Sequence, residues 1–387
     1  MAGNASLGCA KAAKNDEFYT QYSDVEAEMN AYVEFDPDVF RDKTVLLPCD
    51  DPEWSSFTRY FAANFARFGL RKLISTSYAK SKGRGTEASP ELDSPLFDES
   101  LRESRGRLFT LERAADGTGD VGIGDIRFEG YLKGDGDFRS AEVRRLRDEA
   151  DFVITNPPFS LVHDFVDWLC ETDKRFIFIG NDNMVKYKEV FPLLKRNEAW
   201  LGWTRPKEFL VPDGAGARDN VTMREDGVRV ASFGNNCWLT NVDHGGRHQP
   251  LLLDTREHNL RYNRKLRKRL KEKYNAQDYP SYSNFDALEV PYVECIPSDY
   301  DGVMGVPITF LDKHDPDQFE LVGITGDLEW AQRECSFFRP PPKDIQQISR
   351  ERNKTWRVQK AYVDDQDSLP LIPVYDRLFI RRRKGQR

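Results

Sequence analysis

The residues with the clearest chemical potential are Asn156, Pro157, Pro158 and Phe159, a tetrapeptide that follows residues 151–155. These five preceding residues, DFVIT, predict a short buried strand. An exocyclic or amide nitrogen is planar and a poor nucleophile until hydrogen-bond acceptors draw on its N–H groups. The Asn156 side-chain oxygen and the Pro157 carbonyl are such acceptors, and they would stabilise positive charge on a nitrogen that attacks a sulfonium methyl. The tetrapeptide therefore predicts methyl transfer to a planar nitrogen.

The two prolines and the aromatic residue favour the same chemistry. Each proline fixes φ near about −65° and has no competing N–H, so the Pro157 carbonyl is held in place. Phe159 offers a flat apolar face on which a base could stack. A rigid turn is the alternative for an isolated Asn-Pro-Pro. The preceding strand and the aromatic fourth residue are typical of enzymes that methylate a nitrogen.

Composition excludes several other classes. The 387 residues, 39% hydrophobic, suffice for one large domain and a smaller one. Six cysteines lie far apart with no C-x-x-C pair, which argues against structural zinc and a disulfide scaffold. His244 and His248 have an i,i+4 spacing, but two of the three residues between them are glycines that disfavour a helix, so we expect no metal. No apolar run is long enough to span a membrane and no signal core is present, which predicts a cytoplasmic protein.

The charge is acidic overall but basic locally. A net charge of −7 is not the usual footprint of a nucleic-acid binder, although only the contacting surface matters. Basic residues concentrate in residues 261–271 and in the tail at 381–384. The candidates for contacts with a nucleic-acid backbone are Arg264, Lys265, Arg267 and Lys268. A solvated helix face and a frayed terminus are the alternative interpretations.

The pattern of elements predicts an α/β fold. Residues 43–47, 72–77, 151–155 and 175–179 read as buried strands, and 236–241 as a later one. Asp51 is a candidate N-cap with Pro52 at the first helical position. The helix it starts has apolar residues at 54, 57, 61, 65 and 68 and is closed by Gly69. Further helices are expected at 161–170 and 184–196. The strand–helix–strand order predicts a doubly wound parallel sheet.

Two stretches depart from this pattern. Residues 79–131 are rich in Ser, Gly, Pro and charge, and we interpret them as an insertion or hairpin outside the sheet. Beyond about residue 244 the chain is polar, Tyr-rich and basic. We therefore expect a catalytic domain at 1–243 and a separate lobe at 244–387 that can contribute strands to the core.

Six segments together resemble the EcoRI-type family of adenine-specific DNA methyltransferases, in that family's order. They are DEFYTQY at 16–22, CDDP at 49–52, GDGDFRS at 134–140, TNPPFS at 155–160, NNCWLTN at 235–241 and DYDGVMGVPITFL at 299–311. The resemblance implies the Rossmann-like, mostly parallel sheet of class I methyltransferases and a C-terminal target-recognition region. It also implies that S-adenosylmethionine is the methyl donor and that adenine in double-stranded DNA is the substrate.

The resemblance also implies roles for individual residues. The donor-binding positions are Phe18, Tyr19, Thr20, Cys49, Asp50, Asp51, Asp137 and Phe138. The first three match the motif beside the methionine portion, and the next three match a loop whose carboxylates accept from the ammonium group or the ribose. The last two match an element near the adenosine. Residues 156–159 match the catalytic loop, and Trp238 lies in the segment that helps to enclose an extruded base.

Two departures from the family pattern leave the ribose ligand open. The loop after the first strand has no G-x-G, and residues 72–77 are followed by Tyr78 rather than by an acid. Residues 79–131 match the family poorly.

The leading hypothesis is transfer of methyl to adenine N6 in a flipped base, as the modification enzyme of a restriction–modification system. A cognate endonuclease would share the site without binding the enzyme, and the gene could be prokaryotic or viral. The alternatives are methylation of RNA adenine or of a protein glutamine, and a DNA-binding protein without catalysis. The intact NPPF argues against the last.

Overall fold

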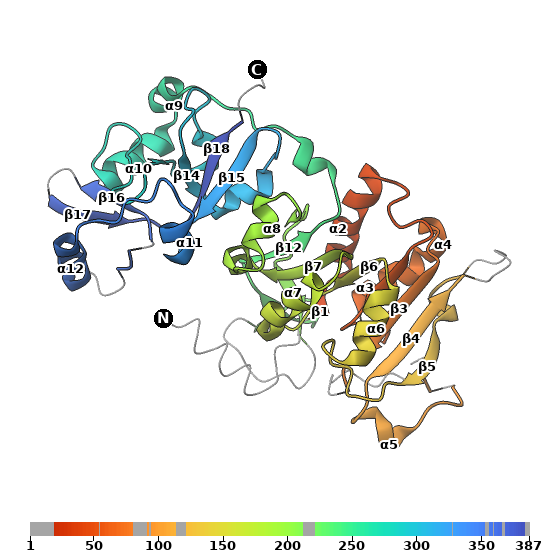
Figure 1. Cartoon of the computed structure of the whole chain (residues 1–387). Coiled ribbons are helices and arrows are strands. Elements are labelled where there is room, and N and C mark those ends of the chain that lie inside the picture. The colour runs from red at the N-terminus through yellow and green to blue at the C-terminus, as the bar shows by residue number, and fades with distance from the viewer. Residues whose placement is uncertain are drawn as a thin grey trace. The chain divides into compact units, whose positions relative to one another are not determined.

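The computed structural model describes residues 19–53, 55–79, 91–92, 94–113, 121–211, 221–326, 328–352, 356–358, 360–365 and 368–383. The chain divides into two compact units. The first comprises residues 1–189 and 199–245, and the second comprises 190–198 and 246–387 (Figure 1). Phe18 lies outside the described residues.

An eight-stranded mixed sheet forms the centre of the first unit (Figure 1). Its strands, in spatial order, are β5 (Arg127–Tyr131), β4 (Arg107–Glu112), β3 (Lys72–Ser77), β2 (Thr44–Leu47), β6 (Phe152–Thr155), β7 (Arg175–Asn181), β12 (Asn236–Thr240) and β8 (Trp200–Leu201). The four strands β3, β2, β6 and β7 pair in parallel, and the flanking strands pair antiparallel. The expected central strands are confirmed.

Helices cover both faces of this sheet. Val45 and Ile154 belong to a core that also contains residues of α2 (Tyr22–Phe35), α3 (Ser56–Ala63) and α4 (Phe65–Phe68). On the other face, Phe178 of β7 contacts Phe165 of α7 (Val162–Cys170), and α6 (Ala141–Glu149) packs near β2. Strands covered on both faces read as continuous apolar runs, which is why FVIT and TVLL are fully buried.

The helix after β2 begins later than the sequence predicts. Ser55, not Asp51, is its N-cap, because the Ser55 hydroxyl oxygen accepts from the N–H groups of Phe57 and Thr58. The carboxylate of Asp51 is instead buried against Arg107. The single expected helix is also two, α3 and α4, separated at Asn64, and it ends as predicted at Gly69 in the left-handed region.

Residues 79–131 were expected outside the sheet, and this prediction is wrong. β4 pairs with β3 over the whole length from Lys72 to Ser77, and β5 extends the ladder by pairing with β4 (Figure 1). The alternation along β4 turns Phe109 and Leu111 into the core, and this period of two is the sign of a strand with one covered face. Residues 80–90, 93 and 114–120 lie outside the described part.

The helix expected at 184–196 is also wrong. A 3-10 helix at Asp182–Lys186 is capped by the Asn181 side chain, and a separate helix α8 (Phe191–Lys195) follows with Pro192 in its first turn. A proline is tolerated in the first turn but breaks a helix interior, so the chain cannot run helically through this position. The two pieces fall in different units.

A second, small sheet of the first unit carries the N-terminal motif. Its order is β1 (Tyr19–Thr20), β9 (Glu208–Leu210), β11 (Arg229–Ser232) and β10 (Val221–Met223), all antiparallel. Thr20 is the register partner of Phe209. Residues distant in sequence are thereby joined at one place in the fold.

The second unit has sheets of its own. The larger has the order β13 (Leu288–Glu289), β14 (Met304–Pro307), β18 (Arg377–Arg382) and β15 (Phe319–Ile324), and the smaller pairs β16 (Tyr362–Asp365) with β17 (Ser368–Pro373). Among the described strands, none after Thr240 joins the eight-stranded sheet, contrary to the expectation that the lobe can lend strands to it. The lobe instead takes α8 from earlier in the chain.

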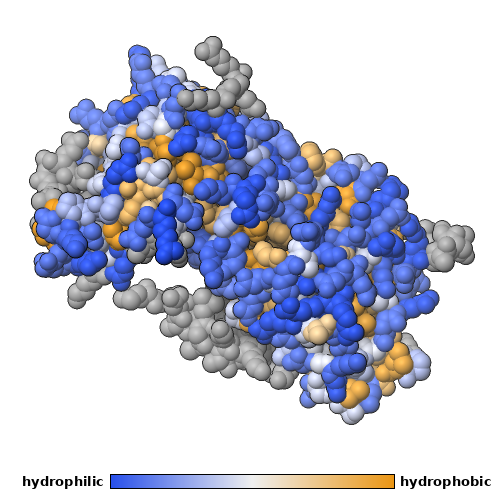
Figure 2. All heavy atoms as spheres, viewed as in Figure 1, coloured by the Kyte–Doolittle hydropathy of each residue, from blue (hydrophilic) through white to orange (hydrophobic). Residues whose placement is uncertain are grey.

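The remaining helices are α5 (Glu99–Arg102), α9 (Arg256–Tyr262), α10 (Arg264–Tyr274), α11 (Leu328–Arg333) and α12 (Lys343–Arg352). No helix in the described ranges has the length and apolarity to cross a membrane. Figure 2 shows hydrophilic side chains over most of the visible face, with apolar side chains gathered in small patches.

Candidate active site

The loops after β2 and β6 lie together because these strands are adjacent and parallel. Thr155, the last residue of β6, donates its hydroxyl to Asp50 Oδ2 at 2.6 Å, and Ser55 donates to Asp50 Oδ1 at 2.8 Å. Asn156 follows Thr155 directly. The carboxyl group of Asp50 therefore links the loop after β2 to the start of the Asn-Pro-Pro-Phe loop.

Asp50 is buried, and burial makes its carboxyl group harder to ionise. Burial raises the pKa of this carboxyl to about 7, against the two hydroxyl donors, which lower it, while the neighbouring Asp51 raises it further. The backbone of Asp50 is also fixed, since its N–H donates to the Thr76 carbonyl at 2.9 Å and its carbonyl accepts from Thr58 at 3.1 Å. Asp50 thus holds the loop in place from both side chain and backbone.

The predicted catalytic residues form a short bent segment at the end of β6. Asn156 is half-buried, Pro157 is buried, and Phe159 starts a 3-10 helix at Phe159–Leu161 that leads into α7. The ring of Phe159 meets Phe209 and Phe233 edge-on, with centroids 5.6 Å and 6.0 Å away. Two aromatic residues of the small-sheet region therefore fix the orientation of this ring.

The N-terminal motif reaches the same place. Ser56, the first residue of α3, donates its hydroxyl to the Thr20 carbonyl at 2.7 Å, and Thr20 lies opposite Phe209 in the small sheet. Tyr19 is half-buried and Thr20 is buried. The structure thus brings Tyr19 and Thr20, the loop of residues 49–52 and Phe159 to one place in the fold.

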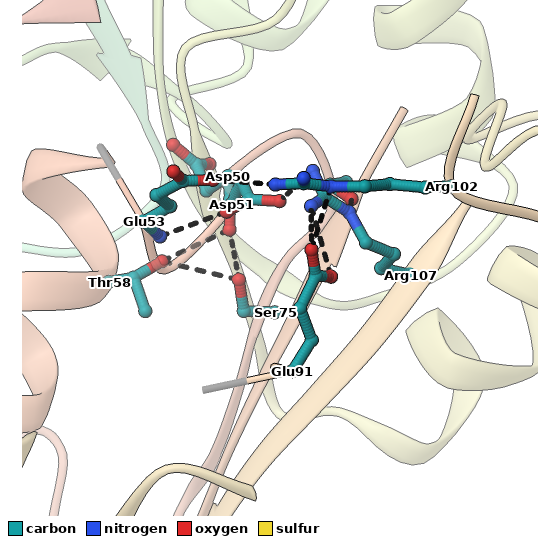
Figure 3. Close-up of polar contacts among 9 residues, drawn as sticks. Asp50, Asp51, Glu53, Thr58, Ser75, Glu91, Arg102 and Arg107 are labelled. Carbon is teal, nitrogen blue, oxygen red and sulfur yellow. Dashed lines mark hydrogen bonds and ion pairs between the residues drawn. The ribbon is translucent and has the colours of Figure 1, made fainter. Parts of the chain in front are cut away.

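A buried charge cluster surrounds the loop after β2 (Figure 3). Arg107 lies 2.5 Å from Asp51 Oδ2 and 3.0 Å from Glu91, and Arg102 lies 2.9 Å from Glu91. Glu53 is 3.8 Å from Arg102. Three carboxylates therefore share two guanidinium groups. This negative excess suits a cationic ligand such as a sulfonium that also bears an ammonium group.

Asp137 and Phe138 of the GDGDFRS loop differ in burial: the first is half-buried and the second lies in the core. Asp137 is half-buried and lies 2.6 Å from Arg139, whose hydrogen bonds lower the pKa of the carboxyl. Arg139 also reaches Asp164 of α7 at 2.6 Å. Phe138 is only 3% exposed and packs between Phe165 and Trp168. The structure therefore leaves Asp137 accessible to a ligand, whereas the Phe138 ring is part of the core.

Trp238 also lies in the core. Its ring is fully buried, meets Phe57 edge-on at 5.8 Å and donates to Thr204 Oγ1 at 3.0 Å. Thr204 in turn donates its hydroxyl and its N–H to the buried Glu28, each at 2.6 Å. The ring has no exposed face here, so the prediction that it helps to hold a base gains no support from its position.

Sequence reasoning missed the residues of β3 and β4 that hydrogen-bond to the loop after β2 and to its neighbours. Ser75 donates to the Asp50 carbonyl, Thr76 donates to the Pro48 carbonyl at 2.9 Å, and Ser77 accepts from Arg107 Nε at 2.9 Å. The available signal was the run of three hydroxyl residues at the end of the KLISTS strand. Arg107 had no signal, because its segment was interpreted as an insertion.

The predicted DNA-contact residues lie on α10 in the second unit. Leu266, Leu270 and Tyr274 are buried, which turns the opposite face of this helix to solvent. Arg264 and Lys268 are exposed on that face, and Lys268 lies 3.9 Å from the exposed Glu272 one turn later. Lys265 is also exposed but lies 3.1 Å from Glu294.

Arg267 and the basic tail have structural partners. Arg267 donates to the carbonyls of Leu260 and Arg261 at the end of α9. In the tail, Arg381 pairs with Glu320, and Arg382 donates to the Ser298 carbonyl. These partners favour the exposed face of α10 over the tail as a surface for phosphates. Within the described ranges, no group of three or more His, Cys, Asp or Glu is placed to hold a metal ion.

Comparison with known proteins shows the family of this chain. The family model described as Adenine-specific methyltransferase EcoRI matches residues 6–383. Type II methyltransferase M.EcoRI of Escherichia coli is 40% identical, over 88% of this chain and 97% of that protein. Type II methyltransferase M.MpnI of Mycoplasma pneumoniae is 33% identical, over 81% of this chain and 83% of that protein. No solved structure matches significantly.

The α/β fold with its large mixed sheet is consistent with a methyltransferase. The chain belongs to the EcoRI family of adenine-specific methyltransferases, because the family model covers nearly its whole length. It is therefore a DNA adenine methyltransferase, and its family implies S-adenosylmethionine as the methyl donor.

Proposed function

We propose that this enzyme methylates N6 of a specific adenine in double-stranded DNA after flipping the base out of the helix. The observation that carries the proposal is the hydrogen bond from Thr155 to Asp50, which joins the Asn-Pro-Pro-Phe loop to the loop after β2. A methyl transfer requires the acceptor nitrogen and the donor methyl to meet in line. Two loops fixed to each other through a buried group supply such preorganisation.

The donor lies, in this proposal, against the loop of residues 49–52, with Tyr19 and Thr20 on one side and Asp137 on another. S-adenosylmethionine, when bound, supplies an electrophilic methyl on a sulfonium. The excess of carboxylates around Asp51 fits this cation. Both carboxyl oxygens of Asp50 accept from hydroxyl groups, so we assign it to holding the loop rather than to direct contact.

Asn156 and Pro157 act on the acceptor nitrogen. The Asn156 side-chain oxygen and the Pro157 carbonyl each accept a hydrogen bond from one N–H group of the adenine amino group. These hydrogen bonds raise the electron density on the nitrogen. The same dipoles stabilise the positive charge that develops during attack. No titrating base is required at this step, since the proton leaves after the nitrogen has become cationic.

Phe159 supplies the surface on which the flipped adenine stacks. Its ring is half-buried, and its T-shaped contacts with Phe209 and Phe233 fix the orientation in which it would meet a base. Flipping is needed because duplex stacking hides the atom to be methylated. Trp238 contributes through Thr204 and Glu28, which set the position of the chain that leads to β9.

The second unit is the target-recognition region in this proposal, and α10 supplies contacts to phosphates. The exposed cations Arg264 and Lys268 on a helix with one buried face support this role. We further propose that the enzyme is the modification partner in a cytoplasmic restriction–modification system of a prokaryote or its virus. Its endonuclease would read the same sequence without binding this chain. The Type II names of its relatives support this context.

The test is to identify the methylated acceptor. Purified enzyme with methyl-labelled donor is offered duplex DNA, RNA and a cell lysate protein fraction, and DNA from expressing cells is sequenced for methylated adenines. We expect label on N6 of adenine at one recurrent DNA sequence. Label confined to RNA or to protein glutamine would overturn the assignment. The Asn156→Ala variant is the matched control for contaminating activity.

A further inference from the structure

The Arg107 side chain contacts three separate segments of the chain. It is 4% exposed, and its guanidinium lies 2.5 Å from Asp51 and 3.0 Å from both carboxylate oxygens of Glu91 (Figure 3). Its Nε donates to the Ser77 hydroxyl at 2.9 Å. A buried guanidinium is costly unless its donors are all paired. Arg107 is therefore held in one orientation, and it holds the loop after β2 to β3 and to Glu91.

The surrounding carboxylates depend on this residue. Asp51 and Glu91 are 2% and 0% exposed, and the burial of Asp51 raises its pKa while Arg107 opposes the increase. The other cation, Arg102, lies 2.9 Å from Glu91 and 3.8 Å from Glu53. Without Arg107, Asp51 would lose its only close cation among the described side chains. The loop would then move toward water to solvate that carboxylate.

The backbone just before β4 is hydrogen-bonded to the GDGDFRS loop, residues 134–140, which carries Asp137. The N–H of Gly106 donates to the Gly134 carbonyl at 2.9 Å, and the N–H of Leu132 donates to the Gly106 carbonyl at 2.7 Å. Gly136 has φ +87°, and a Cβ there would collide with the Ser77 carbonyl and crowd the Gly106 Cα at 3.1 Å. The loop that carries Asp137 is thus built against the residue next to Arg107.

We propose that Arg107 is a positioning residue of the methyl-donor site, which makes the β4–β5 hairpin a working part of that site. Arg107 touches no reacting atom. It acts through Asp51 and the backbone of Gly106, and so fixes the two loops that flank the donor relative to each other. This inference rests on the proposed donor site between residues 49–52 and Asp137.

The test uses matched substitutions at the two ends of one strand. Arg107→Met removes the buried cation, and Arg113→Met removes an exposed one just after β4, where Arg113 pairs with Asp42. Donor affinity is measured by calorimetry with S-adenosylmethionine alone, without DNA, and turnover is measured at saturating donor. We expect donor Kd to rise about tenfold or more in Arg107→Met and less than about twofold in Arg113→Met. We expect kcat at saturating donor to change by less than about threefold.

Two further measurements separate positioning from general stability. Arg107→Lys keeps the charge but not the fork, so it should fold and recover part of the affinity. In the double variant with Asp51→Asn, loss of Arg107 should add little to the loss from Asp51→Asn alone, because both act through one loop. Additive losses, or a loss of kcat equal to the loss of affinity, would overturn the proposal. An unchanged donor Kd in Arg107→Met would also overturn it.

Failure of the proposed function is distinguishable from failure of this inference. If the wild-type enzyme methylates no DNA adenine, the acceptor assignment fails, while the donor affinities still decide the role of Arg107. If the wild-type enzyme methylates DNA and Arg107→Met binds donor normally, this inference fails alone.

Discussion

The two units each bury an arginine against carboxylates, but they do so in different parts of the fold. In the first unit Arg107 joins loops at strand ends, and two guanidinium groups face three carboxylates. In the second unit Arg377 of β18 meets Glu289 of β13 in a bidentate pair, at 2.6 Å and 2.9 Å. Tyr274 and Tyr282 donate their hydroxyls to the same carboxylate.

The difference separates a scaffold from a site. The Glu289 pair is balanced in charge and saturated with donors, and it spans β14, where Gly305 leaves room for the Tyr282 ring. Tyr274 is the last residue of α10, so this pair anchors the basic helix. The Asp51 cluster keeps an excess of negative charge next to loops. A balanced pair fixes structure, whereas an unbalanced one can also attract a cation.

The largest expected effect comes from breaking the balanced pair. Arg377→Met leaves Glu289 buried without its cation, which should cost about 3–5 kcal/mol of unfolding free energy. Arg381→Met on the same strand is the control, since its pair with Glu320 is exposed and should contribute less than about 1 kcal/mol. Denaturant unfolding measures both. We expect DNA affinity to fall and donor affinity to persist; an equal loss of donor affinity would mean that the pair supports the catalytic unit.

Asn156→Ala tests the catalytic side of the comparison. Removal of one preorganised acceptor should lower kcat by about 10²–10³ or more, with donor affinity retained, because Asn156 acts on the target nitrogen. Asn156→Asp keeps an acceptor and should lose less. Single-turnover rates and donor calorimetry measure the two effects. A parallel loss of donor affinity would assign the loop a structural role instead.

Asp50 makes the stability of the first unit depend on pH. Its folded pKa of about 7 exceeds the ordinary value of 3.8, so the folded state holds a proton that the unfolded state releases. This contribution is fully present below about pH 4 and is lost as pH rises through 7, on the order of 1–4 kcal/mol. Asp50→Asn cannot titrate, so its unfolding free energy should vary less between pH 4 and 8. Identical pH profiles for the variant and the wild type would contradict the assignment.

The smallest expected effects concern the exposed face of α10. Arg264→Gln with Lys268→Gln should reduce the slope of log DNA affinity against log salt by about two units, because each phosphate contact releases about one counterion. Lys265→Gln with Arg267→Gln should change the slope less, since these side chains serve Glu294 and the end of α9. Arg144→Gln with Arg145→Gln on α6 removes equal charge from the first unit as a control. Equal slopes in all three variants would return α10 to a solvated helix face.

Much of the architecture followed from local pattern. The segments 43–47, 151–155 and 175–179 predicted the parallel centre, because strands covered on both faces read as apolar runs. The strand predicted at 72–77 is less apolar, since Ser75, Thr76 and Ser77 serve the loop after β2. Gly69 marked a helix end because its left-handed conformation suits glycine. The Asn-Pro-Pro-Phe loop after FVIT identified the chemistry, since few residue types can activate a planar nitrogen.

Local pattern failed where distant residues decide. Asp51 looked like an N-cap, but Arg107, 56 positions later, takes its carboxylate, and Ser55 caps the helix instead. The sequence did not predict β4 as a strand of the sheet, because its alternation of buried and exposed residues is short and follows a polar stretch. Trp238 and Phe138 are aromatic residues in donor or base motifs, yet the first is fully buried and the second nearly so.

The sequence by itself predicted the parallel core and the Asn-Pro-Pro-Phe loop, and it carried the family resemblance, because these depend on residue types within a few positions of each other. Only the tertiary structure decided how the site is held. The Thr155 bond to Asp50 joins residues 105 positions apart, and the ion pair of Arg107 with Asp51 joins residues 56 positions apart. Such contacts leave no periodic trace in the chain, since each depends on which loops the sheet order brings together.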